Sequence, residues 1–417
     1  MPGYPRGLVQ IVNVRGLRPD RCYRLELLTR TRARLDSAWQ HAASAFVDTL
    51  PERLPAGSWE SAFRIMVGSC FARAQDGGQT TRAFEQLWAD PAERPALKFL
   101  VGDQVYLDVG LPIFRRMSTD QIRARVLNHY GQAWRALAGM LERGGTWMLP
   151  DDHEYHNNFP SVSGVLNPYL RISERYRAAW TKVARAAVRN IQQTTKVRLL
   201  TIGDDLSFCV LDLRSGRRAR DQGFADPESF AAVRQWLRGL TGPGVLVISQ
   251  LLMRDGGRRT DNNLACFRGQ YSALVEAIAA CGHDVVVLAG DVHFSRICDT
   301  TFASGKRLIE VASSPMSNMD KFRALLTARV PDRKPASFPP IAIDGVAPAL
   351  VNYRRQISTH RRNWTYPRAR STENFVTVGF LRGCGGVRMR VKAWRLSAGP
   401  CAGSLPALDY EYDYVIS

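Results

Sequence analysis

Six short apolar runs in this chain each end abruptly in residues that suit metal or phosphate binding. The six runs cover residues 63–67, 98–101, 146–149, 208–211, 245–248 and 285–288. Short apolar runs bounded by turns predict buried strands, and ligands in layered α/β sheets lie at the carboxyl ends of strands. We therefore expect Cys, Asp, Tyr, His and Asn side chains from distant parts of the chain to converge on one rim, as a metal centre requires.

Length and composition indicate a large folded core. The chain has 417 residues, of which 45% are hydrophobic, enough for one large domain or one domain with appendages. No run approaches the ~20 apolar residues that a membrane-spanning helix needs. Residues 1–15 lack the apolar core of a signal peptide, so the chain as it stands is expected in the cytoplasm. The oligomeric state stays open.

The charge balance is strongly basic. The chain has 57 Lys and Arg against 38 Asp and Glu, a formal net charge of +19. Such a field can attract nucleic acid, anionic lipid or phosphorylated substrates. The Arg residues are scattered along the chain, which favours a compositional bias for most of them. The field could still raise the encounter rate with a phosphate ester.

The eight cysteines include one of special interest. None forms a CxxC pair, which excludes zinc ribbons and thioredoxin motifs. Cys209 lies inside an apolar run and is expected in the core. Cys70 follows a strand end instead, where a thiolate would favour Fe, Zn or Cu over Mg or Ca. The alternative, a nucleophilic Cys–His pair, is less favoured because nearby carboxylates oppose a thiolate unless cations offset them.

The chain divides into a small N-terminal β element and a large second part. Within residues 1–60, the pattern predicts a strand at 8–12, a turn at 16–20, a strand at 23–27 and a linker at 51–60. Residues 61–417 would form the catalytic domain. Its block from 62 to 318 alternates strands with expected helices at 121–143, 172–192, 227–240 and 272–280, with Asp226 as an N-cap.

After this block the pattern changes to β. Five prolines between residues 320 and 350 predict a surface loop. Three further strands are expected at 374–380, 387–394 and 410–416, the last of them at a sheet edge.

Residues 102–108 form the first chemically informative cluster. The carboxylate of Asp103, in a turn after a buried strand, can bridge two cations, and Gly102 allows the tight exit from the strand. Tyr106 could point back as a phenolate ligand. The alternative has Asp103 capping the next helix and Tyr106 as ordinary packing, and the segment taken alone favours this alternative.

Residues 151–158 form a more specific cluster. Asp151, Asp152 and Glu154 beside His153 suit metal ligation or general acid–base work. The spacing to the next His excludes the HExxH zinc motif. The alternative is a polar surface loop, but the apolar run directly before the cluster disfavours it.

Two further clusters complete the set. Asp291 and His293 follow the last apolar run, and three of the seven His residues fall in such clusters. Arg214, Arg217 and Arg218 could clamp a phosphate, with Arg214 favoured because it lies nearest a strand end. The other two suit a solvated basic turn equally well. No P-loop and no GxGxxG motif is present.

In this order, the motifs resemble those of the alkaline phosphatase D (PhoD-like) family, a variant of the calcineurin-like metallophosphoesterases. The resemblance covers residues 62–318 well and the C-terminal strands loosely. The matching pieces are Ser69-Cys70, Gly102-Asp103-Gln104-Val105-Tyr106, Asp151-Asp152-His153-Glu154 with Asn157-Asn158, Leu211-Asp212-Leu213-Arg214, Ser249-Gln250, Gly290-Asp291-Val292-His293-Phe294-Ser295 and Ser313-Ser314-Pro315.

The resemblance implies a four-layer α/β/β/α sandwich and a dinuclear centre. Fe³⁺ would be held by Cys70, Asp103, Tyr106 and His293. A second divalent ion, Ca²⁺ with Zn²⁺ or Mn²⁺ as alternatives, would share Asp103 and use Asn158 and Asp291. Whether Asn158 or Asp152 is the ligand stays open. Asp152 and His153 would act as acid–base groups or support the ligands.

The chain departs from the family pattern at its N-terminus. Family members usually carry a twin-arginine export signal and often a full β-sandwich before the catalytic part. No such signal is visible here, and residues 16–23 resemble the end of a shortened sandwich. Localisation and access of substrate to the site are therefore open.

These observations predict a metal-dependent phosphoesterase that hydrolyses phosphate monoesters or diesters with metal-activated water. The first alternative is a nuclease or phospholipase-type diesterase, with nucleic acid or anionic lipid as substrate. The second alternative is an inactive polyanion-binding protein on the same scaffold.

Overall fold

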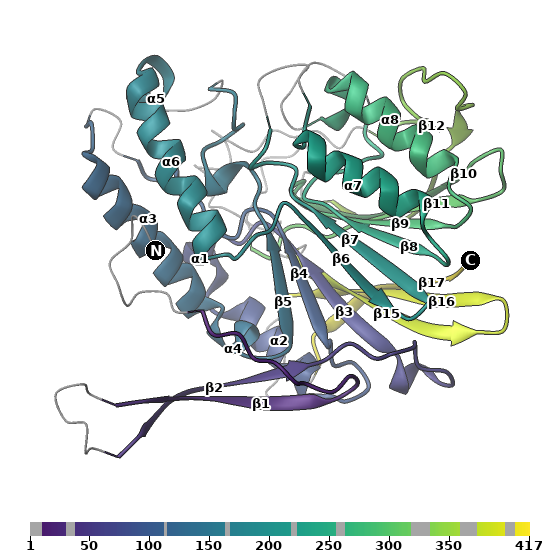
Figure 1. Ribbon diagram of the computed structural model, residues 1–417, viewed down its shortest axis with the longest axis horizontal. Helices are drawn as coiled ribbons and strands as arrows, with labels where there is room; N and C mark the ends of the chain where they lie inside the picture. Colours follow the sequence, from purple (N-terminus) through teal and green to yellow (C-terminus); the bar gives the residue numbers. More distant parts are fainter. Residues whose placement is uncertain are drawn as a thin grey trace.

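The computed structural model describes residues 11–30, 38–111, 115–162, 167–217, 223–255, 263–317, 334–358, 373–396 and 405–417. Two mixed sheets dominate this part of the chain (Figure 1). The six-stranded sheet has the order β17-β16-β15-β3-β4-β5, with strands β3 Phe63–Gly68, β4 Leu97–Val101, β5 Gly145–Leu149, β15 Asn374–Gly383, β16 Gly386–Arg395 and β17 Ala407–Ile416.

The second sheet has seven strands in the order β14-β10-β11-β9-β8-β7-β6. Its strands are β6 Val197–Ile202, β7 Leu206–Leu211, β8 Gly244–Val247, β9 Val285–Ala289, β10 Phe294–Thr301, β11 Arg307–Ala312 and β14 Asn352–Ser358. In each sheet the strands that precede the chemically interesting turns run parallel to their neighbours, β3 with β4 and β5, and β7 with β8 and β9.

The described helices are α1 Arg73–Asp76, α2 Gln79–Ala89, α3 Thr119–Ala136, α4 Ala138–Leu141, α5 Pro168–Ile172, α6 Glu174–Asn190, α7 Pro227–Arg238 and α8 Arg268–Ala279. The stretches predicted as helical correspond to α3 with α4, α6, α7 and α8, whereas α1, α2 and α5 were not predicted. The predicted N-cap of α7 is confirmed, since the Ser229 N–H donates to the Asp226 carboxylate at 3.2 Å. The predicted helix at 121–143 is two helices, α3 and α4, which meet at Leu137.

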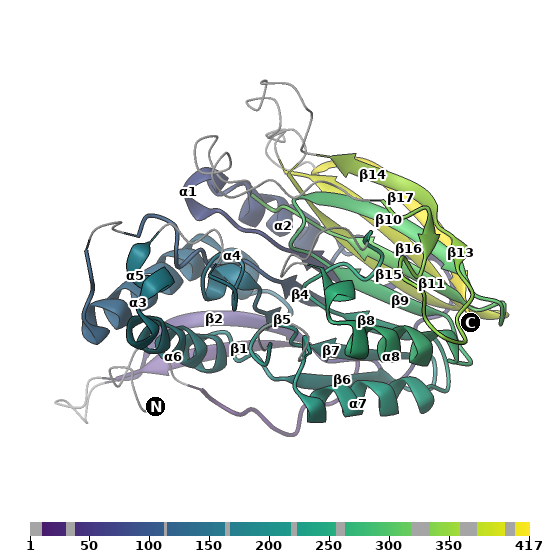
Figure 2. The same ribbon diagram turned by 90° about the horizontal axis from the view of Figure 1, so that it is seen from above.

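Alternation along the strands builds four layers. In β3, Ile65 and Val67 point into a core shared by the two sheets, whereas Met66 points outward beneath α2. The outer face of the seven-stranded sheet packs against α7 and α8, which cover it in Figure 2. The predicted four-layer α/β/β/α sandwich is confirmed.

The outer face of β4 carries a fully buried lysine. The Lys98 ammonium donates to the carbonyl oxygens of Arg143 and Gly144 and lies over the ring of Phe84. Burial lowers the pKa of Lys98 from 10.5 to about 7. The folded state therefore loses this proton at lower pH than the unfolded chain.

This shift predicts a pH-dependent stability. Between pH 7 and 10.5 the unfolded chain binds more protons, so the free energy of unfolding should rise with pH there; below pH 7 the cost of the buried charge is present in full. We expect a gain on the order of 4 kcal/mol between pH 7 and 10. Urea unfolding of Lys98→Met should lack this rise, and the exposed Lys182→Met should keep it. Equal slopes in all three proteins would contradict the prediction.

The N-terminal element differs from its prediction. β1 (Cys22–Thr29) pairs in antiparallel fashion with the downstream β2 (Gln40–Asp48), and not with an upstream strand. Ile11 and Val12 form no strand, while residues 8–10 lie outside the described part. The hairpin lies beside β5 in Figure 1, where the Phe46 N–H donates to Glu142 and its carbonyl accepts from Gly144. The division at residue 60 stays a prediction.

The C-terminal predictions hold for the described residues. The three expected strands are β15, β16 and β17, and β17 is an edge strand. Of the expected proline-rich loop, residues 334–350 are described and contain a short pairing of β12 (Ser337–Phe338) with β13 (Ala349–Leu350). In the described part of the chain, no helix has the length and apolar character needed to cross a membrane.

Candidate metal centre

The turns after strands of both sheets bring a set of buried acidic and thiol side chains together. Cys70 follows β3, Asp103 follows β4, Asp152 follows β5 and Asp291 follows β9. One ligand atom from each of Cys70, Asp103 and Asp291 lies within 4.8 Å of the others. The same holds for Asp103, Asp151, Asp152 and Asp291, and for Asp103, Asp152 and His153. All of these residues are buried, and the predicted convergence on one rim is observed.

The backbone at these turns has an uncommon conformation. Seven described residues other than glycine have positive φ, and five of them are predicted ligands. These five have φ between 53° and 60° and are Cys70, Asp103, Asn158, Asp291 and His293. Residues other than glycine rarely adopt this left-handed conformation, and those that do cluster at functional sites. At Cys70, Asp103 and Asp291 this conformation turns the chain just after a strand.

Two glycines permit the close approach of the turns. Gly102 has φ +105°, and a Cβ there would lie 2.7 Å from the Asp151 Cβ. A Cβ at Gly290 would lie 2.6 Å from both the Ser69 Cβ and the Val101 carbonyl oxygen. The expected role of Gly102 in the tight exit from β4 is confirmed. Gly290 permits the same close approach where the turn after β9 meets the other sheet.

Serine hydroxyls hold the turns of the two sheets together. The Ser69 hydroxyl donates to the Ser313 carbonyl at 2.9 Å and accepts from the Asp291 N–H at 3.1 Å. The Ser314 hydroxyl donates to the Cys70 sulfur at 3.2 Å and accepts from the His293 N–H at 3.0 Å. These bonds connect the turn after β3 to the turn after β9.

Electrostatics in this cluster is dominated by negative groups. Burial raises the pKa of Asp103 and of Asp291 well above the usual range, and the neighbouring aspartates raise both further. Burial and then Asp103 and Asp291 raise the pKa of the Cys70 thiol well above its ordinary value. Without bound cations, some of these acidic groups must stay protonated, because several negative charges buried close together are unfavourable.

The Tyr106 hydroxyl adds an unpaired donor to the same cluster. It is buried and makes no well-formed hydrogen bond within the described residues. Burial, Cys70, Asp103 and Asp291 raise the pKa of Tyr106 well above its ordinary value. Buried polar groups normally have a partner, so an orphaned phenol beside a thiol and two carboxylates indicates an expected ligand.

The donor set therefore fits metal ions. A bound cation deprotonates coordinating thiols and reverses the pKa shifts of nearby acids. Thiolate favours Fe, Zn or Cu, whereas carboxylate oxygens also suit Ca and Mn. Cys70, Tyr106 and the surrounding carboxylates combine both kinds of donor in one buried place.

Two of the predicted ligands are placed less directly. The His293 ring belongs to none of the groups of clustered ligand atoms among the described residues, although His293 lies two residues after Asp291. Asn158 is half-buried, and its N–H donates to the Asp152 carboxylate. Because Asp152 lies with Asp103 and Asp291, the choice between Asn158 and Asp152 stays open.

His153 has an acidic partner that the sequence did not indicate. Its Nδ1 lies 2.7 Å from the Asp108 carboxylate, and its ring packs against Tyr106 with centroids 4.5 Å apart. Burial opposes the charged imidazolium, but Asp108, Asp103 and Asp152 outweigh burial and raise the pKa of His153 well above its ordinary value. The only sequence signal for Asp108 is its place two residues after Tyr106.

Arg214 is placed differently from a free phosphate clamp. Its guanidinium is fully buried and donates through Nε and Nη2 to the two carboxylate oxygens of Asp151, at 2.9 and 2.6 Å. Nη2 also lies 4.0 Å from Asp291. Arg217 donates to Gln250 at 2.7 Å, and Arg218 lies outside the described residues. The phosphate-binding role of Arg214 stays a prediction.

Glu154, which the sequence placed in the acidic cluster beside His153, connects two turns of the site. Its carboxylate accepts the backbone N–H groups of Asp103, Val105 and Asp151, at 3.0, 3.1 and 2.8 Å. Burial raises the pKa of Glu154 to about 7, although these three donors favour the carboxylate. The side chain thereby fixes the two turns that carry Asp103 and Asp151.

We predict that Glu154→Gln lowers metal affinity by about 10- to 100-fold, as loss of a group supporting metal ligands typically does. The substituted amide would direct a donor at backbone N–H groups that need an acceptor. Metal titration followed by calorimetry measures the effect, with the exposed Glu142→Gln as the matched control. An affinity for Glu154→Gln within twofold of the control would contradict the prediction.

Comparison of three-dimensional structures defines the class of fold. The chain matches the structure of PhoD with a TM-score of 0.60 at 14% identity, over 96% of this chain and 76% of that one. It matches purple acid phosphatase PPD1 from yellow lupin (Lupinus luteus) seeds with a TM-score of 0.52 at 11% identity, over 96% of this chain and 60% of that one. The chain has the metallophosphoesterase fold.

Within that class, the architecture is PhoD-like. At these identities the likeness concerns the fold. No protein-family model and no curated protein sequence matches the chain.

Proposed function

We propose that the protein is a metal-dependent hydrolase of phosphate mono- or diesters. The observation that carries this proposal is the buried group of Cys70, Asp103 and Asp291, whose ligand atoms lie within 4.8 Å of one another at the strand ends. The metallophosphoesterase fold around them supports the same reaction class. Fold alone does not define function, and the donor set supplies the chemical reason for this reaction class.

The residues that would hold the first ion, Fe³⁺, are Cys70, Asp103, Tyr106 and His293. Asp103 would be shared with a second ion, Ca²⁺, Zn²⁺ or Mn²⁺, together with Asp291 and either Asn158 or Asp152. Two such ions, when bound, supply Lewis acidity that activates water and stabilises charge on the transferred phosphoryl group.

His153 is the residue best suited to move a proton. Because Nδ1 faces Asp108 at 2.7 Å, the imidazole has a fixed orientation and Nε2 is the nitrogen left for the substrate. A protonated imidazole held in this orientation could donate its Nε2 proton to the departing alkoxide oxygen. Asp152 shares the cluster with His153 and Asp103.

The net charge of +19 favours a second candidate function, a diesterase acting on nucleic acid or anionic lipid. Binding of a polyanion would then fall steeply with added salt, because counterions are released on association. Turnover of small esters that does not change with salt would favour the first proposal. The inactive polyanion-binding protein would bind without metal and hydrolyse nothing.

The first test is elemental analysis of the purified and reconstituted protein, with a visible spectrum. Near-stoichiometric iron with a charge-transfer band, and hydrolysis of a phosphate monoester or diester, would support the proposal. Zinc or manganese without colour would keep the hydrolase and remove the ferric centre. Absence of both metal and hydrolysis after reconstitution would overturn it.

A further inference from the structure

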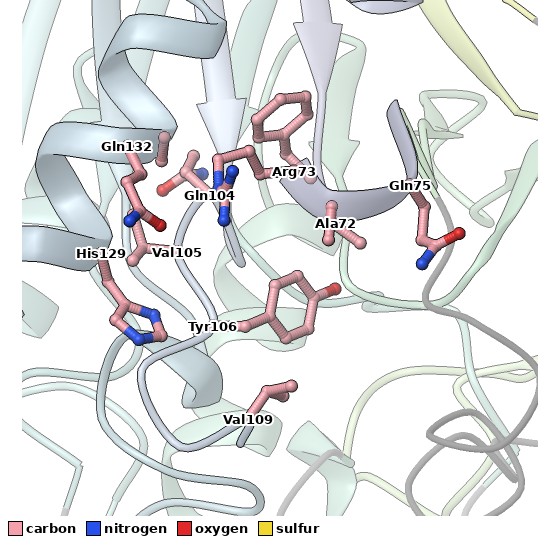
Figure 3. Close-up of a pocket in the computed structure, with 12 residues that line it drawn as sticks. Ala72, Arg73, Gln75, Gln104, Val105, Tyr106, Val109, His129 and Gln132 are labelled. Atoms are coloured by element: carbon pink, nitrogen blue, oxygen red, sulfur yellow. The ribbon is translucent and has the colours of Figure 1, made fainter. Parts of the chain in front are cut away.

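A pocket of about 110 Å³ is lined by residues that follow Cys70 and Asp103 along the chain and by α3, and Figure 3 shows these lining residues. Two of its walls come from the turns that carry Cys70 and Asp103, namely residues 71–75 and 104–106. The third wall is α3, which contributes residues 129, 132 and 133. Tyr106 lines the pocket and is also close to Cys70, Asp103 and Asp291. An organic group attached to a phosphoryl group at the metal centre would have this space within reach.

The most informative lining residue is Gln104, which is fully buried. Its Oε1 accepts from the Gln192 amide at 3.1 Å, and Gln192 is itself oriented by the Glu154 carboxylate at 3.3 Å. This chain of bonds defines which end of the Gln104 amide is the oxygen. The remaining Nε2 is buried and has no hydrogen-bond partner in the described part of the chain. A buried donor of this kind requires an acceptor.

A positively charged side chain also lines this pocket. Arg73 is exposed and forms no ion pair with any described residue. In Figure 3 its guanidinium extends toward Gln104 across the pocket. The rest of the lining is mixed, with apolar surface from Ala72, Val109 and Ala133 and polar side chains from Gln75, His129 and Gln132. The pocket thus combines the positive charge of Arg73 and the Gln104 amide with both polar and apolar surface.

We propose that this pocket binds the organic substituent of the phosphate ester and selects a short chain that ends in a hydrogen-bond acceptor, above all a carboxylate. The proposal rests on the proposed function, because it takes the phosphoryl group to lie at the metal centre. The pocket volume of about 110 Å³ suits a small substituent. Arg73 disfavours a cationic substituent and Gln104 favours an acceptor.

The test uses three phosphate esters of matched length: propyl phosphate, the analogue ending in a carboxylate and the analogue ending in an ammonium group. We expect kcat/KM for the carboxylate ester to exceed that for the ammonium ester by at least about tenfold, since hydrogen bonds to charged groups are worth that much or more. Arg73→Gln and Gln104→Leu should each reduce this ratio several-fold. The surface variant Arg234→Gln on α7 removes the same charge as Arg73→Gln and should leave the ratio unchanged.

Calorimetry with the corresponding non-hydrolysable phosphonates separates this inference from the proposed function. Preferential binding of the carboxylate phosphonate that Arg73→Gln weakens would support the pocket even if no ester is hydrolysed. Hydrolysis of all three esters at the same kcat/KM, unaffected by Arg73→Gln, would overturn the pocket and leave the hydrolase intact. Should Gln104→Leu fail to fold, the exposed Arg73 still decides the outcome.

Discussion

Asp103→Asn should lower ester hydrolysis by at least about a hundredfold and reduce the bound metal. Loss of a group that only supports a ligand already costs about 10- to 100-fold, and Asp103 takes part in all three groups of clustered ligand atoms. The fold should persist, because the asparagine side-chain oxygen can still accept a hydrogen bond from the backbone N–H of His153. In the native protein Asp103 Oδ1 accepts this bond at 3.2 Å. Removal of one negative charge from a crowded cluster also lessens repulsion in the metal-free protein.

The measurement combines kcat/KM with metal content and circular dichroism. Asp120→Asn is the matched control, because Asp120 is an exposed residue on α3 that forms a surface ion pair with Arg123. A folded Asp103→Asn protein that retains both metal and activity would remove Asp103 from the centre.

Arg214→Met should lower the free energy of unfolding by about 3–5 kcal/mol, the usual cost of removing one partner from a buried ion pair. Arg214 and Asp151 are both fully buried, with two hydrogen bonds between them. Burial favours the neutral acid, but Arg214 outweighs burial and holds the pKa of Asp151 well below its usual range. Without Arg214, no guanidinium offsets the negative charge of the buried Asp151 carboxylate, which lies close to Asp291.

Urea unfolding of the metal-free protein measures this effect, and the exposed Arg234→Met on α7 is the control. The double variant Arg214→Met/Asp151→Asn should recover part of the loss, because it removes the unpaired charge as well. A change below about 1 kcal/mol for Arg214→Met would show that the pair contributes little.

The strand ends were predictable because burial on both faces leaves a continuous apolar run. That pattern located β3, β4, β7, β8 and β9, and with them the turns after each strand. The order of the turns along the chain then indicated the class of fold. Parallel pairing brings such turns to one edge of a sheet without knowledge of any loop.

The pairings within the site could not be predicted in the same way. Asp108 and His153 are 45 residues apart, and Arg214 and Asp151 are 63 apart. No periodic pattern relates such positions, because the intervening helices and loops determine which side chains meet. The partner of β1 was missed for a similar reason: residues 8–12 are more apolar than β2, but pairing depends on where the chain returns.

Positive φ explains why spacing could not place His293. A residue with ordinary backbone angles two positions after Asp291 would be expected to share its direction. Asp291 and His293 both have left-handed angles, which reorient the backbone at each step. The His293 ring belongs to none of the clustered groups of ligand atoms among the described residues.

The candidate centre straddles the seam between the two sheets. Cys70 and Asp103 are attached to the six-stranded sheet, whereas Asp291 and His293 are attached to the seven-stranded one. Any sliding of one sheet over the other would change the distances between these donors. Ions held by donors from both sheets would act as cross-links between the two halves of the sandwich. Amide exchange in β3 and β9 should then slow in step on metal addition, as expected when two sheets open as one cooperative unit.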